Sequence, residues 1–139
     1  MSQYCSQADI TAEINSQDLI AFLDDEGTGL LNVTRLNQII DRQAAKIDGR
    51  LATIYPTPFN PVPAAVRDAC TLFVCEALYR RRLTPDEKNP FHIEAEAMRE
   101  RLKRIGANEE LLDLDVAFPR AFPQGAAITV PVSFNGNSL

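Results

Sequence analysis

The longest periodic run of apolar residues lies between positions 33 and 54. Its apolar side chains recur at steps of three and four, which places them on one face of an α-helix. They are Val33, Leu36, Ile39, Ile40, Ala44, Ile47, Leu51 and Ile54. Asn32 comes just before the run and is a favourable N-cap residue. The pattern predicts a long central helix that ends near Tyr55 and spans about 35 Å.

Two shorter helices are predicted ahead of it. Ser6 and Asp9 form the cap and acidic first turn of a helix that ends near Ile14. Asn15 or Ser16 is the cap of a second helix. The segment 24–29 contains three carboxylates and two glycines, so it predicts a loop.

The second half of the chain predicts two more helices. Four prolines within residues 55–63 predict an extended connector, because proline fixes φ and pushes the preceding residue out of the helical region. The helix after it is expected to reach about Leu83. Asn89 and Pro90 predict the cap and first position of a last helix, which Gly106 ends. The expected fold class is all-α, a small bundle of four to five helices.

The composition changes after Gly106, so we divide the chain into a helical domain, residues 1–112, and an extended C-terminal arm, residues 113–139. The arm is apolar and interrupted by prolines, with a short β-prone segment at Ala127–Phe134. Exposed apolar side chains favour aggregation unless they dock on another surface. We therefore expect the arm to be completed by another protein molecule. The side chains expected in that contact are Phe118, Phe122, Ile128, Val130 and Phe134.

The charge balance narrows the choice of partner. The chain has 14 lysines and arginines against 19 aspartates and glutamates, a net charge of −5. A net negative protein gains little from releasing DNA counterions, which counts against general nucleic-acid binding. No apolar run approaches the ~18 residues of a membrane span, and the N-terminus has no secretory pattern. We expect a protein folded in the cytoplasm, with no membrane partner.

No catalytic, cofactor or metal site is predicted. The only histidine, His92, lies near a helix start, where surface and capping roles are commoner than general-base chemistry. Cys5, Cys70 and Cys75 lack metal-ligand spacing and are expected to be reduced, small apolar side chains. The chain has no glycine-rich phosphate loop. It is therefore not expected to be an enzyme.

A calcium loop is an alternative interpretation of the segment 24–35. With Asp24 at position one, Glu26, Thr28 and Gly29 fall at positions three, five and six. Position twelve requires a bidentate carboxylate, and Arg35 stands there instead. The favoured interpretation is a glycine loop between two helices.

The compact basic run Arg80, Arg81 and Arg82 allows two interpretations. It complements the dipole of its own helix at the C-terminus, or it binds carboxylates of a neighbouring subunit, or phosphate. Basic residues of the last helix would allow a shared patch. A small helical DNA-binding regulator using Arg80–Arg82 and Lys103/Arg104 is the alternative function.

Several segments taken together resemble the Mu-like (pro)phage small virion protein family. They are Asp24–Gly29 before a long helix, Ala45–Leu51 leading to Tyr55, the proline connector, Cys75–Arg81, and a final helix ending in Arg104–Gly106. The resemblance covers about residues 3–112. This family is similar to the head–tail connector adaptors of tailed phages.

The resemblance implies an assembly role in the virion. Related adaptors form a ring, commonly of twelve subunits, beneath the portal protein and ahead of a stopper or tail-completion protein. DNA passes through the lumen without specific binding, which suits a net negative subunit. The expected location is the virion, assembled in the bacterial host cytoplasm.

Overall fold

A computed structural model describes residues 4–111, and all regular secondary structure within them is helical. The elements are α1 (Gln7–Glu13), α2 (Ser16–Leu23), α3 (Val33–Leu51), α4 (Ala64–Arg81), a 3₁₀ turn η1 (Asp86–Lys88) and α5 (His92–Gly106). The predicted all-α bundle is confirmed in this part of the chain. The arm, residues 113–139, and its β-prone segment lie outside the described residues.

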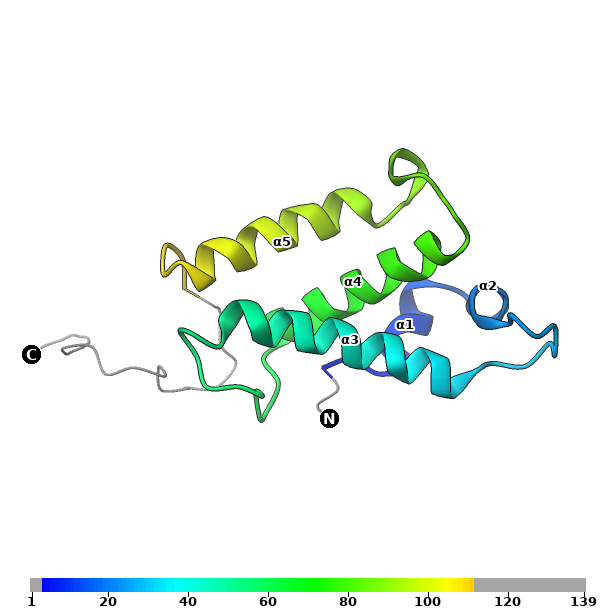
Figure 1. Cartoon of the computed structure of the whole chain (residues 1–139), viewed down its shortest axis with the longest axis horizontal. Helices are drawn as coiled ribbons and strands as arrows, with labels where there is room; N and C mark the ends of the chain where they lie inside the picture. The colour runs from blue at the N-terminus through cyan, green and yellow to red at the C-terminus, as the bar shows by residue number, and fades with distance from the viewer. Residues whose placement is uncertain (1–3, 112–139) are drawn as a thin grey trace, which may run out of the picture.

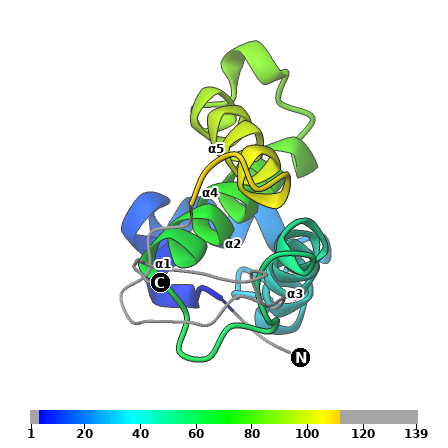
Figure 2. The same ribbon diagram turned by 90° about the vertical axis from the view of Figure 1, so that its left-hand side faces the viewer.

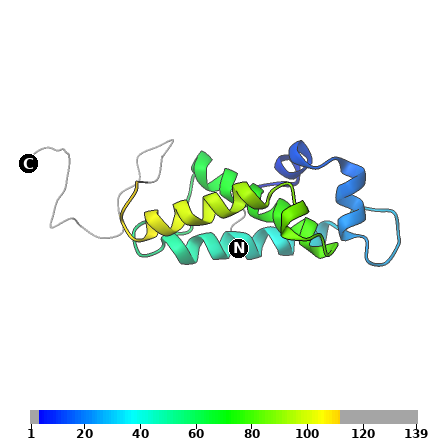
Figure 3. The same ribbon diagram turned by 90° about the horizontal axis from the view of Figure 1, so that it is seen from above.

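Helices α3, α4 and α5 form the body of the bundle, with α4 running opposite to the other two (Figure 1). In the view along the bundle, α1 and α3 lie on opposite sides of α4, and α5 lies above it (Figure 2). Seen from above, α2 and the loop that follows it form one end of the bundle, and the C-terminal ends of α3 and α5 form the other (Figure 3).

The core is built from the apolar faces that the sequence predicts. Removal of such side chains from water is the main stabilising contribution to a bundle of this kind. Fully buried members include Leu36, Ile40, Ile47 and Leu51 of α3, Val66, Val74 and Leu78 of α4, and Leu102 and Ile105 of α5. Val33, the first residue of α3, departs from the prediction and is 48% exposed. None of the helices within residues 4–111 combines the length and the apolar character of a transmembrane span.

The predicted helix starts are confirmed where a side chain caps the helix. Ser6 and Asp9 form a reciprocal capping box at α1. Asn15 accepts a hydrogen bond from the Asp18 amide at 2.9 Å, and Asn32 accepts one from the Arg35 amide at 2.9 Å. Each bond satisfies a backbone N–H that has no partner inside the helix.

Two predicted helix ends are wrong. Helix α3 ends at Leu51 rather than Tyr55, and the chain after it tightens, because the Ile54 amide donates to the Leu51 carbonyl at 3.0 Å in an i→i−3 turn. Helix α4 ends at Arg81 rather than Leu83. Leu83 has φ of 59°, a left-handed conformation that cannot continue a right-handed helix.

The predicted start of the last helix is also wrong. Helix α5 begins at His92, and Asn89 does not cap it. The buried Asn89 side chain instead donates to the Glu76 carbonyl at 3.2 Å and accepts from the Phe91 amide at 3.1 Å. Asn89 therefore joins the α4–α5 loop to the middle of α4.

The proline connector is packed against the body, not simply extended. Phe59 is buried, and its amide donates to the Tyr4 hydroxyl at 3.0 Å. That hydroxyl in turn donates to Asp48 of α3. The peptide bonds before Pro58 and Pro61 are cis. The N-terminal segment, the connector and α3 are thus held together at one point.

The three cysteines are free and buried, as predicted. The sulfur atoms of Cys5 and Cys70 are 3.3 Å apart, where the N-terminal segment meets α4. Burial raises the pKa of the Cys75 thiol to about 12, so that side chain behaves as a small apolar residue.

Candidate assembly interface

The three consecutive arginines at the end of α4 all have partners inside the chain. Arg82 donates to the Ala21 carbonyl at 2.7 Å, and Arg81 donates to the Phe22 carbonyl at 3.1 Å. Both acceptors lie in the last turn of α2. A helix C-terminus carries unsatisfied carbonyls and partial negative charge. Arg81 and Arg82 therefore complement the dipole of α2, a neighbouring helix, in addition to standing at the end of their own.

The same arginines hold the loop that follows α2. Arg81 forms an ion pair with Asp25 at 2.6 Å, and Arg35 of α3 pairs with Asp25 at 3.2 Å. Arg80 points elsewhere, to Asp86 at 3.2 Å and to Glu76 at 3.4 Å. The three positions therefore do not form one basic stripe, as their helical spacing indicates.

We expect Arg81→Ala to loosen the α2–α3 loop. Loss of hydrogen bonds to the end of α2 is expected to lower the free energy of unfolding by about 1 kcal/mol. Amide hydrogen exchange in residues 24–32 is expected to become faster, which NMR measures residue by residue. Arg67→Ala, at an exposed position of α4, is the control and should leave that exchange unchanged. Equal exchange in the two variants would contradict the assigned role.

The glycine loop is organised around one carboxylate. Asp24 accepts hydrogen bonds from the amides of Thr28 and Gly29, both at 2.7 Å. These bonds lower the pKa of Asp24. Gly27 and Gly29 have φ of 73°, which glycine adopts without strain. The interpretation of this segment as a glycine loop is the one that the geometry supports.

Calcium is expected to leave the melting temperature unchanged. The Asp24 oxygens already accept from loop amides, and the Arg35 guanidinium lies 3.3 Å from Glu26. Within residues 4–111, no three acidic, histidine or cysteine side chains gather where a metal ion would bind. Thermal unfolding with and without calcium checks this, because a ligand specific to the folded state raises the melting temperature. A calcium-dependent rise would restore the calcium-loop alternative.

A buried ion cluster lies between α4 and α5. Glu76 of α4 has a side chain that is 3% exposed, and Arg99 of α5 binds both of its carboxylate oxygens, at 2.7 and 2.9 Å. His92 Nδ1 lies 2.8 Å from the same carboxylate. Glu96 also binds Arg99. Burial raises the pKa of Glu76, but hydrogen bonds from Arg99 and His92 outweigh it, so the pKa is held below its ordinary value.

This cluster is not predicted by the sequence pattern. The position of His92 near a helix start favours a surface or capping role, and no role is predicted for Glu76. One feature of the sequence could indicate the cluster, since Glu76 stands next to apolar positions of α4. A carboxylate buried at such a position is expected to have a charged partner, because carboxylates are seldom fully buried unpaired. Its partner lies 23 residues away along the chain, so pairing required knowledge of how α4 and α5 pack.

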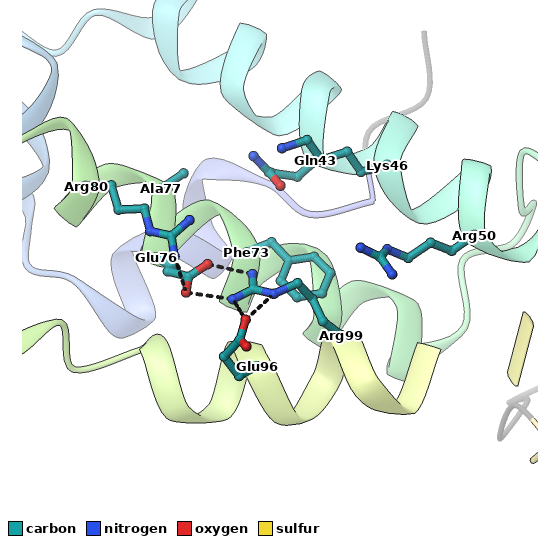
Figure 4. Close-up of a pocket in the computed structure, with 9 residues that line it drawn as sticks. All are labelled: Gln43, Lys46, Arg50, Phe73, Glu76, Ala77, Arg80, Glu96 and Arg99. Carbon is teal, nitrogen blue, oxygen red and sulfur yellow. Dashed lines mark hydrogen bonds and ion pairs between the residues drawn. The ribbon is translucent and has the colours of Figure 1, made fainter. Parts of the chain in front are cut away.

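Beside this cluster, a groove of about 610 Å³ runs between α3, α4 and α5 (Figure 4). Four cationic side chains line it, Lys46, Arg50, Arg80 and Arg99, with Glu76 and Glu96. Arg80 and Arg99 point toward Glu76, whereas no marked contact joins Lys46 or Arg50 to the residues drawn. We call this the basic groove.

A second groove of about 310 Å³ lies between α1, α4 and α5. Its charged lining residues are Glu13, Asp68 and Glu94, one from each helix, and Leu72 and Met98 supply apolar surface. We call this the acidic groove. It was not identified from the sequence, because its three carboxylates are far apart along the chain.

The basic positions of the alternative function do not form one patch. Arg80–Arg82 lie at the C-terminal end of α4, whereas Lys103 and Arg104 lie in the last turn of α5. Since α4 and α5 run in opposite directions, these ends point away from each other (Figure 1). The predicted arm contacts, Phe118, Phe122, Ile128, Val130 and Phe134, lie outside the described residues.

Comparison with known proteins gives one family. A family model described as Bacteriophage Mu, Gp36 matches residues 4–128. The matched range includes all five α-helices and both grooves, and it extends into the predicted arm beyond the range of the sequence resemblance. A search of curated proteins finds no match.

Proposed function

This chain belongs to the Bacteriophage Mu Gp36 family, and we propose that in the phage particle it is a head–tail connector adaptor. In this role it binds the portal protein and closes there into a ring that extends the DNA channel. The observation that carries the proposal is the family match over most of the chain. It is a phage protein, and the adaptor role is the assignment within that class that best suits a small helical domain followed by an apolar arm.

The chemistry of the chain supports an assembly role without catalysis. Glu76 and His92 form a carboxylate–histidine pair at 2.8 Å, and both are joined with Arg99 in a cluster that packs two helices together. Arg81 and Arg82 donate hydrogen bonds to carbonyls in the last turn of α2. In the proposed ring, DNA passes through the lumen without specific contacts, because a chain of net charge −5 is not expected to bind the phosphate backbone of DNA.

The arm supplies the proposed link to other molecules. Phe118, Phe122, Ile128, Val130 and Phe134 are expected to dock on a neighbouring subunit, the portal protein or a downstream stopper or tail-completion protein. Each side chain contributes roughly 1.5–3 kcal/mol when fully buried, before the entropy of ordering is subtracted. The portal protein is included in the assay because it is one of the proposed docking partners of the arm.

The test combines the full chain with the portal protein encoded by the same phage. Electron microscopy is expected to show an added ring on the portal, and light scattering a matching increase in mass. Phe118→Asp combined with Phe122→Asp should reduce ring formation, because charged side chains do not fill an apolar contact. No association between the wild-type chain and the portal would overturn the proposal.

The DNA-binding regulator makes the opposite prediction. It requires a gel shift at about 50 mM salt that weakens steeply as salt is added, because phosphate contacts release counterions. We expect no shift, because Arg81 and Arg82 already bind the end of α2 and the α5 cations lie at the far end of the bundle.

A further inference from the structure

We propose that the basic groove and the acidic groove are the two halves of one contact between neighbouring copies of this chain. The surface around the basic groove of one copy faces the surface around the acidic groove of the next. Lys46 and Arg50 then lie opposite Asp68 and Glu94 across the contact. This inference rests on the proposed function and adds to it the surfaces through which copies meet.

The basic groove has positive charge that the fold leaves uncompensated. Arg99 is bound by Glu76 and Glu96, and Arg80 by Glu76 and Asp86. Among residues 4–111, no carboxylate pairs with Lys46 or Arg50, and both are exposed on α3. The free cations are therefore concentrated on the α3 side of the groove.

Arg42 adds to this charge. It is exposed and lies one helical turn before Lys46, on the same side of α3. Among the described residues it forms no ion pair. The exposed side of α3 beside the groove thus carries three cations, Arg42, Lys46 and Arg50, that form no ion pair within residues 4–111.

The acidic groove has the complementary character. Glu13, Asp68 and Glu94 are all exposed, and none of them forms an ion pair within residues 4–111. No cationic side chain lines this groove. The nearby Arg101 and Arg104 are turned to Glu110, at 2.8 and 3.0 Å.

Apolar surface accompanies the carboxylates. Leu72 and Met98 are only partly buried in the acidic groove, and Phe73 and Ala77 line the basic one. A contact between the grooves would cover apolar surface at its centre and place charge pairs around it, the usual anatomy of a protein interface. Charge complementarity then selects which surfaces meet.

The two grooves lie on opposite sides of the α4–α5 pair. Leu72 of the acidic groove and Ala77 of the basic groove are five positions apart on α4, so they point about 140° away from each other. Figure 2 shows the same arrangement, since α1 borders one side of α4 and α3 the other. Two-fold pairing of identical faces would bring like charges together. Only unlike faces attract, and such a head-to-tail contact generates a ring when its rotation closes.

Two charge-reversed variants test the contact. The first is Lys46→Glu/Arg50→Glu, and the second is Asp68→Lys/Glu94→Lys. Each variant alone has two faces of the same sign and should remain monomeric. A mixture has complementary faces at both of its contacts, so the two variants should associate in alternation. All four positions are exposed on helices, and circular dichroism confirms that each variant is folded.

NMR detects the association. Adding the unlabelled second variant to the ¹⁵N-labelled first variant is expected to shift amide signals around Asp68 and Glu94 and around positions 46 and 50. Each variant alone should show no dependence on concentration. The shifts should decrease as salt is raised from about 50 to about 500 mM, because screening weakens exposed charge pairs.

The matched control variants move the same charge to other exposed sites. Arg67→Glu/Lys88→Glu replaces the first variant and Glu87→Lys/Glu109→Lys the second. Both control variants keep the basic and the acidic groove intact, so each should associate with itself as the wild type does, and its groove signals should depend on its concentration. If the groove variants do not shift each other's signals, or if the groove signals of each control variant alone do not depend on concentration, the inference is wrong.

Its failure is separable from failure of the adaptor assignment. If wild-type chains form a ring on the portal and the groove-reversed variants form it equally well, the adaptor role stands and the groove contact is overturned. If the wild-type chain does not bind the portal, the adaptor role falls, whatever the NMR mixture shows.

Discussion

Replacing Glu76 by alanine is expected to lower the free energy of unfolding by about 3 kcal/mol, which for a domain of this size lowers the melting temperature by about 10 °C. The reason is the charge that remains. Arg99 has a side chain that is 24% exposed, so without Glu76 a largely buried guanidinium loses two hydrogen bonds. Removal of one partner of a buried ion pair lowers the free energy of unfolding more than replacement of both partners by apolar side chains.

Urea unfolding followed by circular dichroism measures this effect. Glu96→Gln is the matched control, because Glu96 binds the same guanidinium from an exposed position. It is expected to change the free energy of unfolding by about 0.5 kcal/mol or less. If the two substitutions have equal effects, the Glu76 cluster does not hold α4 and α5 together.

The Glu76 effect also depends on pH. The pKa of Glu76 is lowered in the folded protein, so its charge stabilises the fold above the unfolded pKa, about 4.3. That stabilisation is lost as the pH falls through the folded pKa, because both states then bind the proton. The difference in stability between the wild type and Glu76→Gln should therefore be smaller at pH 3 than at pH 7. An unchanged difference would show that shape, not charge, is responsible.

Gly106→Ala is expected to destabilise the fold by about 2 kcal/mol, and Gly106→Val by more. A Cβ atom at Gly106 would lie 2.4 Å from the Arg50 carbonyl oxygen, at the point where the ends of α5 and α3 meet. The neighbour is backbone, so the clash is relieved only when the two helices separate.

Gly49→Ala is the matched control for Gly106→Ala. Gly49 lies inside α3, and a Cβ there meets nothing within 4 Å. Alanine is the better helix former, so this substitution should stabilise the protein by about 0.5–1 kcal/mol. Thermal unfolding of the two variants should give shifts of opposite sign. A rise in the melting temperature of both variants would mean that helix propensity, not contact with Arg50, decides the Gly106 result.

The sequence predicted the parts of the fold that depend on near neighbours along the chain. The apolar faces of α3, α4 and α5 follow from steps of three and four residues, and the caps at Ser6, Asn15 and Asn32 follow from local hydrogen bonds. Helix ends were less predictable. Tyr55 and Asn89 both fit local rules for helix ends, but both lie outside the helices. The Tyr55 ring contacts the Phe59 ring, and the Asn89 side chain donates to the Glu76 carbonyl.

The candidate interface was predictable only in part. The three arginines Arg80–Arg82 are recognisable in the sequence because they are consecutive. Their partners are not, since Arg81 and the Phe22 carbonyl are 59 residues apart. The acidic groove collects one carboxylate from each of three helices. A pattern of hydrophobic and polar positions says which face of a helix is solvated, but not which other helix borders that face.

The order of residues alone shows that this chain forms amphipathic helices, where most of them begin, and that a net negative, all-α domain is followed by an apolar arm. These properties arise from backbone geometry and from neighbours within a few residues. Three other properties come from the packing of the helices: Glu76 is buried against Arg99, Gly106 must lack a side chain, and unpaired positive and negative charges lie on opposite sides of α4 and α5. These depend on the angle and rotation at which helices pack, which are fixed by contacts between residues distant along the chain.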